Sequence, residues 1–172
     1  TGPLERVTAR RLTSCRCRRR SDDTLQPASL EPAPTTASTV AISAPGSLST
    51  GQTVTHVVSV DGSTQTLKIT LAYHEAPATL PASFEPVNRL YMQVTAPDAT
   101  IYYGNNVTNG VSAPGGSPET LNNLQQVIVP TPAQGVWSVS VVAQAVNVGF
   151  QGYALAVTGD VSELCPSDYD HN

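Results

Sequence analysis

Val54-Thr55-His56-Val57-Val58-Ser59-Val60 is the stretch that decides the fold, because apolar or bulky side chains recur at every second position. Successive side chains of a β-strand point to opposite faces of the sheet. The alternation therefore predicts a strand whose buried face carries His56 and the even-numbered valines. On that face we expect His56 to be a hydrogen-bonded interior histidine rather than a general base.

The same alternation recurs in four further runs and two shorter ones, separated by turn signals such as Asp61-Gly62 and Pro114-Gly115-Gly116. Short strands with one apolar face each predict an all-β fold, an antiparallel, jelly-roll-like β-sandwich of about eight strands over residues 39–160. The further runs are residues 67–73, 88–94, 137–141 and 153–157, and the shorter ones are 101–103 and 124–129.

The composition narrows the class of protein in the same direction. Of 172 residues (18.0 kDa), 13% are charged, about half the usual fraction, and only one Lys and one Met occur. This composition disfavours a helical bundle. No stretch approaches the ~18 consecutive apolar residues that a membrane-spanning helix needs, so no membrane span is expected.

Basic residues gather at the N-terminus, where the first twenty positions hold seven of the nine Lys and Arg residues. Residues 1–38 are predicted to be extended, with an arginine-rich arm (1–23) and a Pro/Ser/Thr/Ala linker (24–38) that cannot bury a core. The acidic body beyond residue 20 would repel a phosphate backbone, and the arm lacks interleaved aromatic residues, so no nucleic-acid partner is expected. Residues 161–172 are predicted to be a C-terminal tail.

Catalytic motifs are missing from the sequence. His74 adjoins Glu75 but has no nucleophile near it in sequence, and His171 lies in the predicted tail. No Gly-x-Ser-x-Gly elbow, HExxH motif or phosphate-binding glycine loop is present. The chain by itself is therefore not expected to be an enzyme.

Several sequence features favour a secreted or extracellular protein. Cys15, Cys17 and Cys165 are too few for a four-thiolate zinc site, which leaves a disulfide between the arm and Cys165, or reduced thiols on solvated tails. Asn106-Val107-Thr108 is an N-glycosylation sequon. The multibasic run Arg16-Cys17-Arg18-Arg19-Arg20 is of the kind that furin-like secretory proteases cut. Together with the linker, these features predict a secreted glycoprotein.

Acidic side chains in the predicted loops are candidate calcium ligands, since Ca²⁺ takes six to eight oxygen ligands. Turn formation is the alternative role for the same carboxylates, and no EF-hand spacing occurs. No cofactor other than calcium is expected. The candidates are Asp61, Asp98, Glu119, Asp160 and Glu163.

A series of blocks carries a resemblance to a known family: Val87–Asp98, Tyr103–Asn105, Leu121–Val127, Pro132–Val139 and Gln151–Gly159. In order and spacing they resemble the C-terminal β-sandwich domain of subtilisin-like serine proteases (the subtilase family). The resemblance implies a jelly-roll-like domain that follows the catalytic domain, often carries calcium, and stabilises the protease, shapes substrate access or docks it to a surface.

The sequence departs from that family at acidic positions. Arg89 and Tyr91 stand where the family commonly has acids, and Gln125 stands for the acid that follows the paired Asn122 and Asn123. These departures argue against a calcium site built on those positions. We expect the paired asparagine amides to satisfy loop backbone groups.

Two further roles follow from the alternation. Trp137 falls on an inward face and is predicted to anchor the core. Arg89 and Tyr91 share the outward face of their strand, where a planar cation beside an aromatic ring could form a contact patch for a partner or glycan. A solvated strand face is the alternative.

We therefore expect a non-catalytic accessory domain of a secreted subtilisin-like serine protease, with an upstream protease domain as its protein partner. The alternative is an extracellular assembly or adhesion module of a filament, coat or wall, with neighbouring subunits as partners. A lectin-like carbohydrate binder is a third possibility, which rests on fold analogy alone.

Overall fold

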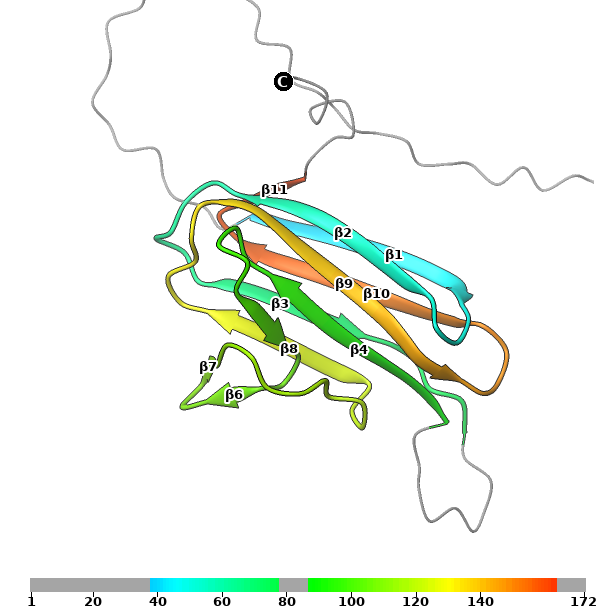
Figure 1. Cartoon of the computed structure of the whole chain (residues 1–172). Coiled ribbons are helices and arrows are strands. Elements are labelled where there is room, and N and C mark those ends of the chain that lie inside the picture. Colours follow the sequence, from blue (N-terminus) through cyan, green and yellow to red (C-terminus); the bar gives the residue numbers. More distant parts are fainter. Residues whose placement is uncertain (1–37, 78–86, 164–172) are drawn as a thin grey trace, which may run out of the picture. The chain divides into compact units, whose positions relative to one another are not determined.

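The computed structural model describes residues 38–77 and 87–163, and it is all-β (Figure 1). The predicted arm and most of the linker lie outside the described residues, as do Cys15, Cys17, Cys165 and His171. The strands are β1 (Ser38–Leu48), β2 (Thr53–Val60), β3 (Leu67–Ala72), β4 (Asn88–Thr95), β5 (Ile101–Tyr103), β6 (Val107–Thr108), β7 (Val111–Ser112), β8 (Leu124–Val129), β9 (Gly135–Val146), β10 (Gln151–Gly159) and β11 (Val161–Glu163).

The strands form two antiparallel sheets and a small hairpin. One sheet has the order β1-β10-β3-β8, the other has the order β11-β2-β9-β4-β5, and β6 pairs with β7. Four pairings are nested along the chain: β1 with β10, β2 with β9, β3 with β8, and β4 with β5. A long hairpin wound on itself in this way is a jelly roll. The predicted antiparallel, jelly-roll-like sandwich is confirmed.

The core lies between the two sheets and takes one side of each strand. In β4, buried side chains from Asn88 to Val94 alternate with half-buried ones. Trp137 of β9 is 1% exposed, and its indole Nε1 donates a hydrogen bond of 2.8 Å to the carbonyl of Ala133. Its ring stacks on Tyr102 of β5, with 6.2 Å between the ring centroids. The hydrophobic cluster includes side chains from both sheets, so apolar burial holds the layers together.

Three elements go beyond the strands that the sequence predicts. In β1, Pro45 and Gly46 interrupt the alternation, and the register with β10 shifts between Ala44 and Leu48. β11 lies in the predicted tail and pairs with β2. The β6–β7 hairpin turns at Asn109 and Gly110, whose φ angles of 54° and 80° suit a two-residue type I′ turn.

Candidate functional site

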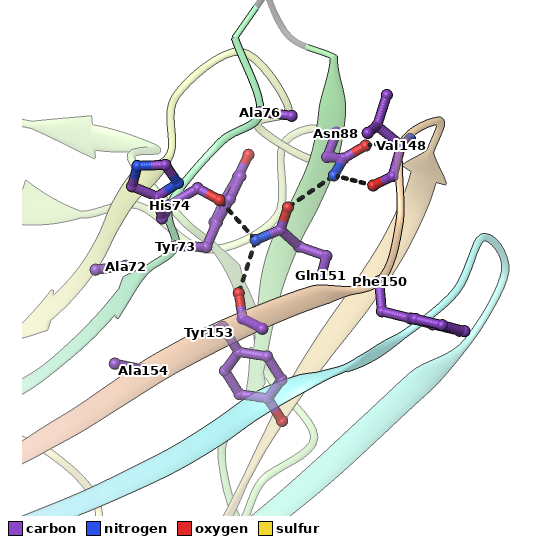
Figure 2. A pocket seen from close by; sticks show the side chains of 11 residues that line it. Ala72, Tyr73, His74, Ala76, Asn88, Val148, Phe150, Gln151, Tyr153 and Ala154 are labelled. Atoms are coloured by element: carbon purple, nitrogen blue, oxygen red, sulfur yellow. Dashed lines mark hydrogen bonds between the residues drawn. The ribbon is translucent and has the colours of Figure 1, made fainter.

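An open pocket of about 480 Å³ lies where β3 ends, β4 begins and β9 turns into β10 (Figure 2). Tyr73 and Tyr153 line it and are buried, whereas Phe150 at its edge is 71% exposed. Val148 of the same turn is also exposed. The pocket therefore combines aromatic walls with apolar side chains that face solvent.

Two buried amides form the floor of this pocket. Asn88 Nδ2 donates to Gln151 Oε1 at 2.9 Å and to the carbonyl of Val148 at 3.0 Å, while its Oδ1 accepts the backbone N–H groups of Asn147 and Val148. Gln151 Nε2 donates to the carbonyls of His74 and Gly152, both at 2.8 Å (Figure 2). These bonds join the end of β3, the start of β4 and the β9–β10 turn. The amides thus brace the loops, and all four hydrogen-bonding positions of Asn88 are occupied.

The described titratable groups around the pocket include His74, Tyr73 and the neighbouring Glu75. The His74 imidazole is exposed, and within the described residues it has no hydrogen bond to a nucleophile. Burial, with smaller contributions from Glu75 and Glu119, raises the pKa of Tyr73, so its phenol stays protonated at neutral pH. Glu75 accepts the backbone N–H of Val87.

A second, smaller groove of about 240 Å³ adjoins the pocket on the outer face of the four-stranded sheet. The two hollows share Ala72 and Ala154 as lining residues. Ala41, Ala156 and Thr70 continue the floor of the groove across β1, β10 and β3. Because these side chains are small and uncharged, this part of the sheet face is recessed and carries no charge.

His56 and Tyr153 join the two sheets through the interior. His56 Nε2 and the Tyr153 hydroxyl lie 2.7 Å apart, and the two rings meet edge to face with centroids 5.9 Å apart. Burial lowers the pKa of His56 and raises the pKa of Tyr153, so both groups are held neutral. His56 is half-buried on the inner face of β2, as the sequence predicts for a hydrogen-bonded interior histidine.

Acid is expected to destabilise the domain through His56. Its folded pKa lies below the ordinary value of 6.5, so the unfolded chain binds a proton first as the pH falls. The stabilisation is complete above pH 6.5 and is lost as the pH falls through the folded pKa. Urea denaturation between pH 7.5 and 5 should show a smaller loss of stability in His56→Gln than in the wild type. An identical loss of stability in His56→Gln and in the wild type would contradict this assignment.

Three neighbouring rows of uncharged side chains cross the outer face of the five-stranded sheet. The register places Thr55, Ser140, Gln93 and Tyr103 side by side across β2, β9, β4 and β5. Thr55 Oγ1 and Ser140 Oγ lie 2.9 Å apart. The neighbouring rows are of the same kind: Val57, Ser138, Thr95 and Ile101 on one side, and Thr53, Val142 and Tyr91 on the other.

The predicted contact patch lies on this face. Arg89 and Tyr91 are both half-buried on the outer side of β4. The Tyr91 ring meets Tyr103 edge to face, with centroids 6.4 Å apart. Arg89 pairs with Ala145 next to a register shift at the start of β4, so it borders the uncharged rows instead of lying within them.

The candidate calcium ligands are spread over separate loops. Within the described ranges, no group of three or more His, Cys, Asp or Glu residues could hold a metal ion. Asp98 accepts the N–H of Thr100, and this bond lowers the pKa of its exposed carboxyl. Asp61 accepts the Ser59 hydroxyl at 2.7 Å, and Glu119 accepts the Leu121 N–H at 2.6 Å. These carboxylates therefore act as turn acceptors, which is the alternative role that the sequence left open.

Asp160 is the remaining calcium candidate with a described side chain. It lies against Gly62, where an added Cβ would lie 1.9 Å from Asp160 Oδ2. The backbone N–H of Asp61 donates to the Asp160 carbonyl at 2.8 Å. The two aspartates thus flank the turn that follows β2. The side chain of Glu163 lies outside the described residues.

Asn106, the predicted glycosylation site, lies in the loop that leads to the β6–β7 hairpin. Its Nδ2 donates to the carbonyls of Ala113 and Gly115, at 3.0 and 2.9 Å. Asn106 also lines a polar hollow of about 420 Å³ together with residues of the 117–121 segment. A glycan on Nδ2 would replace one of the two hydrogen atoms used in these bonds.

Gln125 is the amide that stands where the subtilase domains that the sequence resembles have an acid. It is fully buried, and its Nε2 faces the carbonyls of Leu90, Glu119 and Asn122 at 2.9, 2.9 and 3.2 Å. Its Oε1 accepts the backbone N–H of Met92 at 2.8 Å. The side chain thus ties β8 to β4 and to the loop before β8. A carboxylate could not donate any of the bonds to carbonyls.

The comparisons with known proteins leave the chain without an assigned family. No protein-family model matches the sequence, and no curated protein matches it. In the part of the chain that the structure describes, no helix is long and apolar enough to span a membrane.

Proposed function

We propose that the sandwich is a non-catalytic accessory domain that docks onto a protein partner through the outer face of its five-stranded sheet. The observation that carries this proposal is the uncharged face that runs across β2, β9, β4 and β5 and includes the Tyr91–Tyr103 pair. The cores of protein interfaces are depleted of charge and enriched in tyrosine. The acidic residues with described side chains lie in loops rather than on the strands of this face.

The partner in this proposal is the catalytic domain of a secreted subtilisin-like serine protease. Its support is the resemblance, whose blocks fall on β4, β8, β9 and β10 and supply the interior residues Asn88, Gln125, Trp137 and Gln151. Residues of this kind specify a fold more directly than they specify a partner, so the parent protease needs its own test. Secretion is part of the same proposal, through the sequon at Asn106 and the cysteines.

The sequence of the full-length protein that contains this chain provides that test. We expect the sequence upstream of Thr1 to contain a subtilisin-like domain with its Asp, His and Ser. The isolated catalytic domain should bind the sandwich in isothermal titration calorimetry. A precursor without such a domain would overturn the protease assignment and leave the docking face to be tested on its own.

Gln93→Lys is expected to weaken that binding about 10-fold or more, because it places an unpaired charge in the middle of the face. Gln93 is half-buried between Ser140 and Tyr103. The matched control is Thr70→Lys, which adds the same charge to the outer face of the four-stranded sheet. Equal binding of the two variants in calorimetry would exclude the proposed face.

An assembly module of an extracellular filament, coat or wall is the second candidate. The exposed Phe150 and Val148 beside the alanine-floored groove favour it, because they give the four-stranded sheet an apolar outer surface as well. In that case Thr70→Lys, and not Gln93→Lys, would disrupt the contact between neighbouring subunits.

A further inference from the structure

The turn of the β6–β7 hairpin is made by an asparagine followed by a glycine. Asn109 and Gly110 join the paired residues Thr108 and Val111, and the hairpin lies at the periphery of the sandwich (Figure 1). Both turn residues are exposed, and a Cβ added at Gly110 would meet nothing within 4 Å. The dipeptide is therefore accessible to water.

The two groups of this dipeptide that can react with each other are not held by hydrogen bonds. Among the described residues, neither the side-chain amide of Asn109 nor the N–H of Gly110 has a hydrogen-bond partner. Attack of the glycine nitrogen on the side-chain carbonyl carbon of the asparagine closes a five-membered ring. Glycine favours this closure, because it has no Cβ to shield its nitrogen.

The other asparagines of the chain lack this combination. Asn109 is the one asparagine that a glycine follows. The side-chain amides of several others are also tied to backbone carbonyls, which keeps them in place. These are Asn88, Asn105, Asn106 and Asn147.

Ring closure requires the turn to open, because the positive φ angles of 54° and 80° hold Asn109 and Gly110 in the hairpin conformation. The hairpin is short, with two residues in each strand, and Val107 and Val111 are exposed. A hairpin of this size is marginally stable by itself, and such tips open at a free energy far below that of global unfolding. Ser112 is buried and accepts the N–H of Ile128, so the base of the hairpin holds while the tip opens.

We propose that Asn109 is a site of spontaneous deamidation, with the backbone nitrogen of Gly110 as the nucleophile. The Gly110 nitrogen loses its proton to hydroxide and attacks Cγ of Asn109. The new N–C bond forms, the Cγ–Nδ2 bond breaks, and ammonia leaves. Water then opens the resulting succinimide at either of its two carbonyl groups, which gives aspartate at Cγ or isoaspartate at the main-chain carbonyl.

The modification changes the hairpin and leaves the core in place. Both products add a negative charge, and isoaspartate adds a methylene group to the main chain at the turn. A lengthened turn no longer fits the two-residue connection between Thr108 and Val111. No residue of 107–112 belongs to the hydrophobic cluster between the sheets, so the sandwich does not depend on this turn. The proposal needs no partner and stands apart from the docking function above.

Incubation of the full chain at pH 8, followed by peptide mapping with mass spectrometry, tests the proposal. The peptide that contains Asn109 should gain one mass unit with time, and fragmentation by electron transfer should identify both isoaspartate and aspartate. The reference is a synthetic peptide of residues 105–114. We expect the folded chain to react within about 10-fold of the rate of this peptide, because little free energy is needed to open the turn.

Val148→Gly provides a matched control in the same chain, because it creates a second Asn-Gly dipeptide in an exposed turn. Here both reacting groups are held. Asn147 Nδ2 donates to the carbonyl of Val87 at 2.6 Å, and the N–H of residue 148 donates to Asn88 Oδ1 at 3.1 Å. In this variant Asn147 should deamidate about 10-fold or more slowly than Asn109, because both hydrogen bonds must break before the ring closes.

Three results would overturn the proposal. The first is a rate in the folded chain more than about 10-fold below that of the peptide, which would show that the hairpin holds the dipeptide closed. The second is deamidation of Asn147 in Val148→Gly as fast as that of Asn109, which would show that free reacting groups do not select the site. The third is a product that contains aspartate without isoaspartate, which would exclude the succinimide and Gly110 as the nucleophile.

Discussion

Replacing Trp137 with alanine is expected to lower the free energy of unfolding by about 3–5 kcal/mol. The side chain is 1% exposed and belongs to the hydrophobic cluster between the sheets. Truncation removes the stacking partner of Tyr102 and leaves the Ala133 carbonyl without the indole donor. Because Trp137 is the only tryptophan, unfolding in urea should be followed by far-ultraviolet circular dichroism rather than by fluorescence.

The matched control for Trp137 is its neighbour on the same strand. Val136 is exposed on the outer side of β9, so Val136→Ala should change stability by no more than about 0.5 kcal/mol. If Trp137→Ala cost less than about 1 kcal/mol, the ring would not be the anchor of this core.

Burial itself alternates in most of the strands that the sequence predicts. In β2, β3, β4, β9 and β10, one face enters the core, so the side chains record the period of two. β1 escapes prediction because Pro45 and Gly46 disturb its pattern. The β6–β7 hairpin is too short to alternate, although Asn109-Gly110 is a signal that could have located its turn.

The contacts that shape the candidate site depend on pairings that no local pattern encodes. Asn88 meets Gln151 across 63 positions of sequence, and His56 meets Tyr153 across 97. The sequence predicts an interior histidine but does not name its partner.

Adjacent glutamines show how far the fold separates similar residues. Gln125 is fully buried, and its amide is enclosed by backbone groups of β4 and of the loop before β8. Gln126 points to the outer face, where it is exposed and donates to the Thr70 hydroxyl at 3.3 Å. Replacing each glutamine by glutamate therefore compares the effect of a charge at a buried amide with its effect at a solvated one.

Gln125→Glu is expected to destabilise the domain by about 3–5 kcal/mol at neutral pH, because it buries a carboxylate among carbonyl oxygens. The Leu90, Glu119 and Asn122 carbonyls would lose their donor and repel the new charge. Gln126→Glu should cost no more than about 0.5 kcal/mol. Urea denaturation of both variants measures the difference, and equal losses would contradict this account of Gln125.

The pH dependence of these variants separates charge from lost hydrogen bonds. Burial would raise the folded pKa of the new carboxyl above its unfolded value of about 4.3, so the loss in Gln125→Glu should grow as the pH rises through that interval. As the pH falls towards 4, the protonated acid can again donate one hydrogen bond to a carbonyl, and part of the stability should return. Gln125→Met removes the hydrogen bonds without adding a charge, so its loss of about 1–3 kcal/mol should stay constant with pH relative to the wild type.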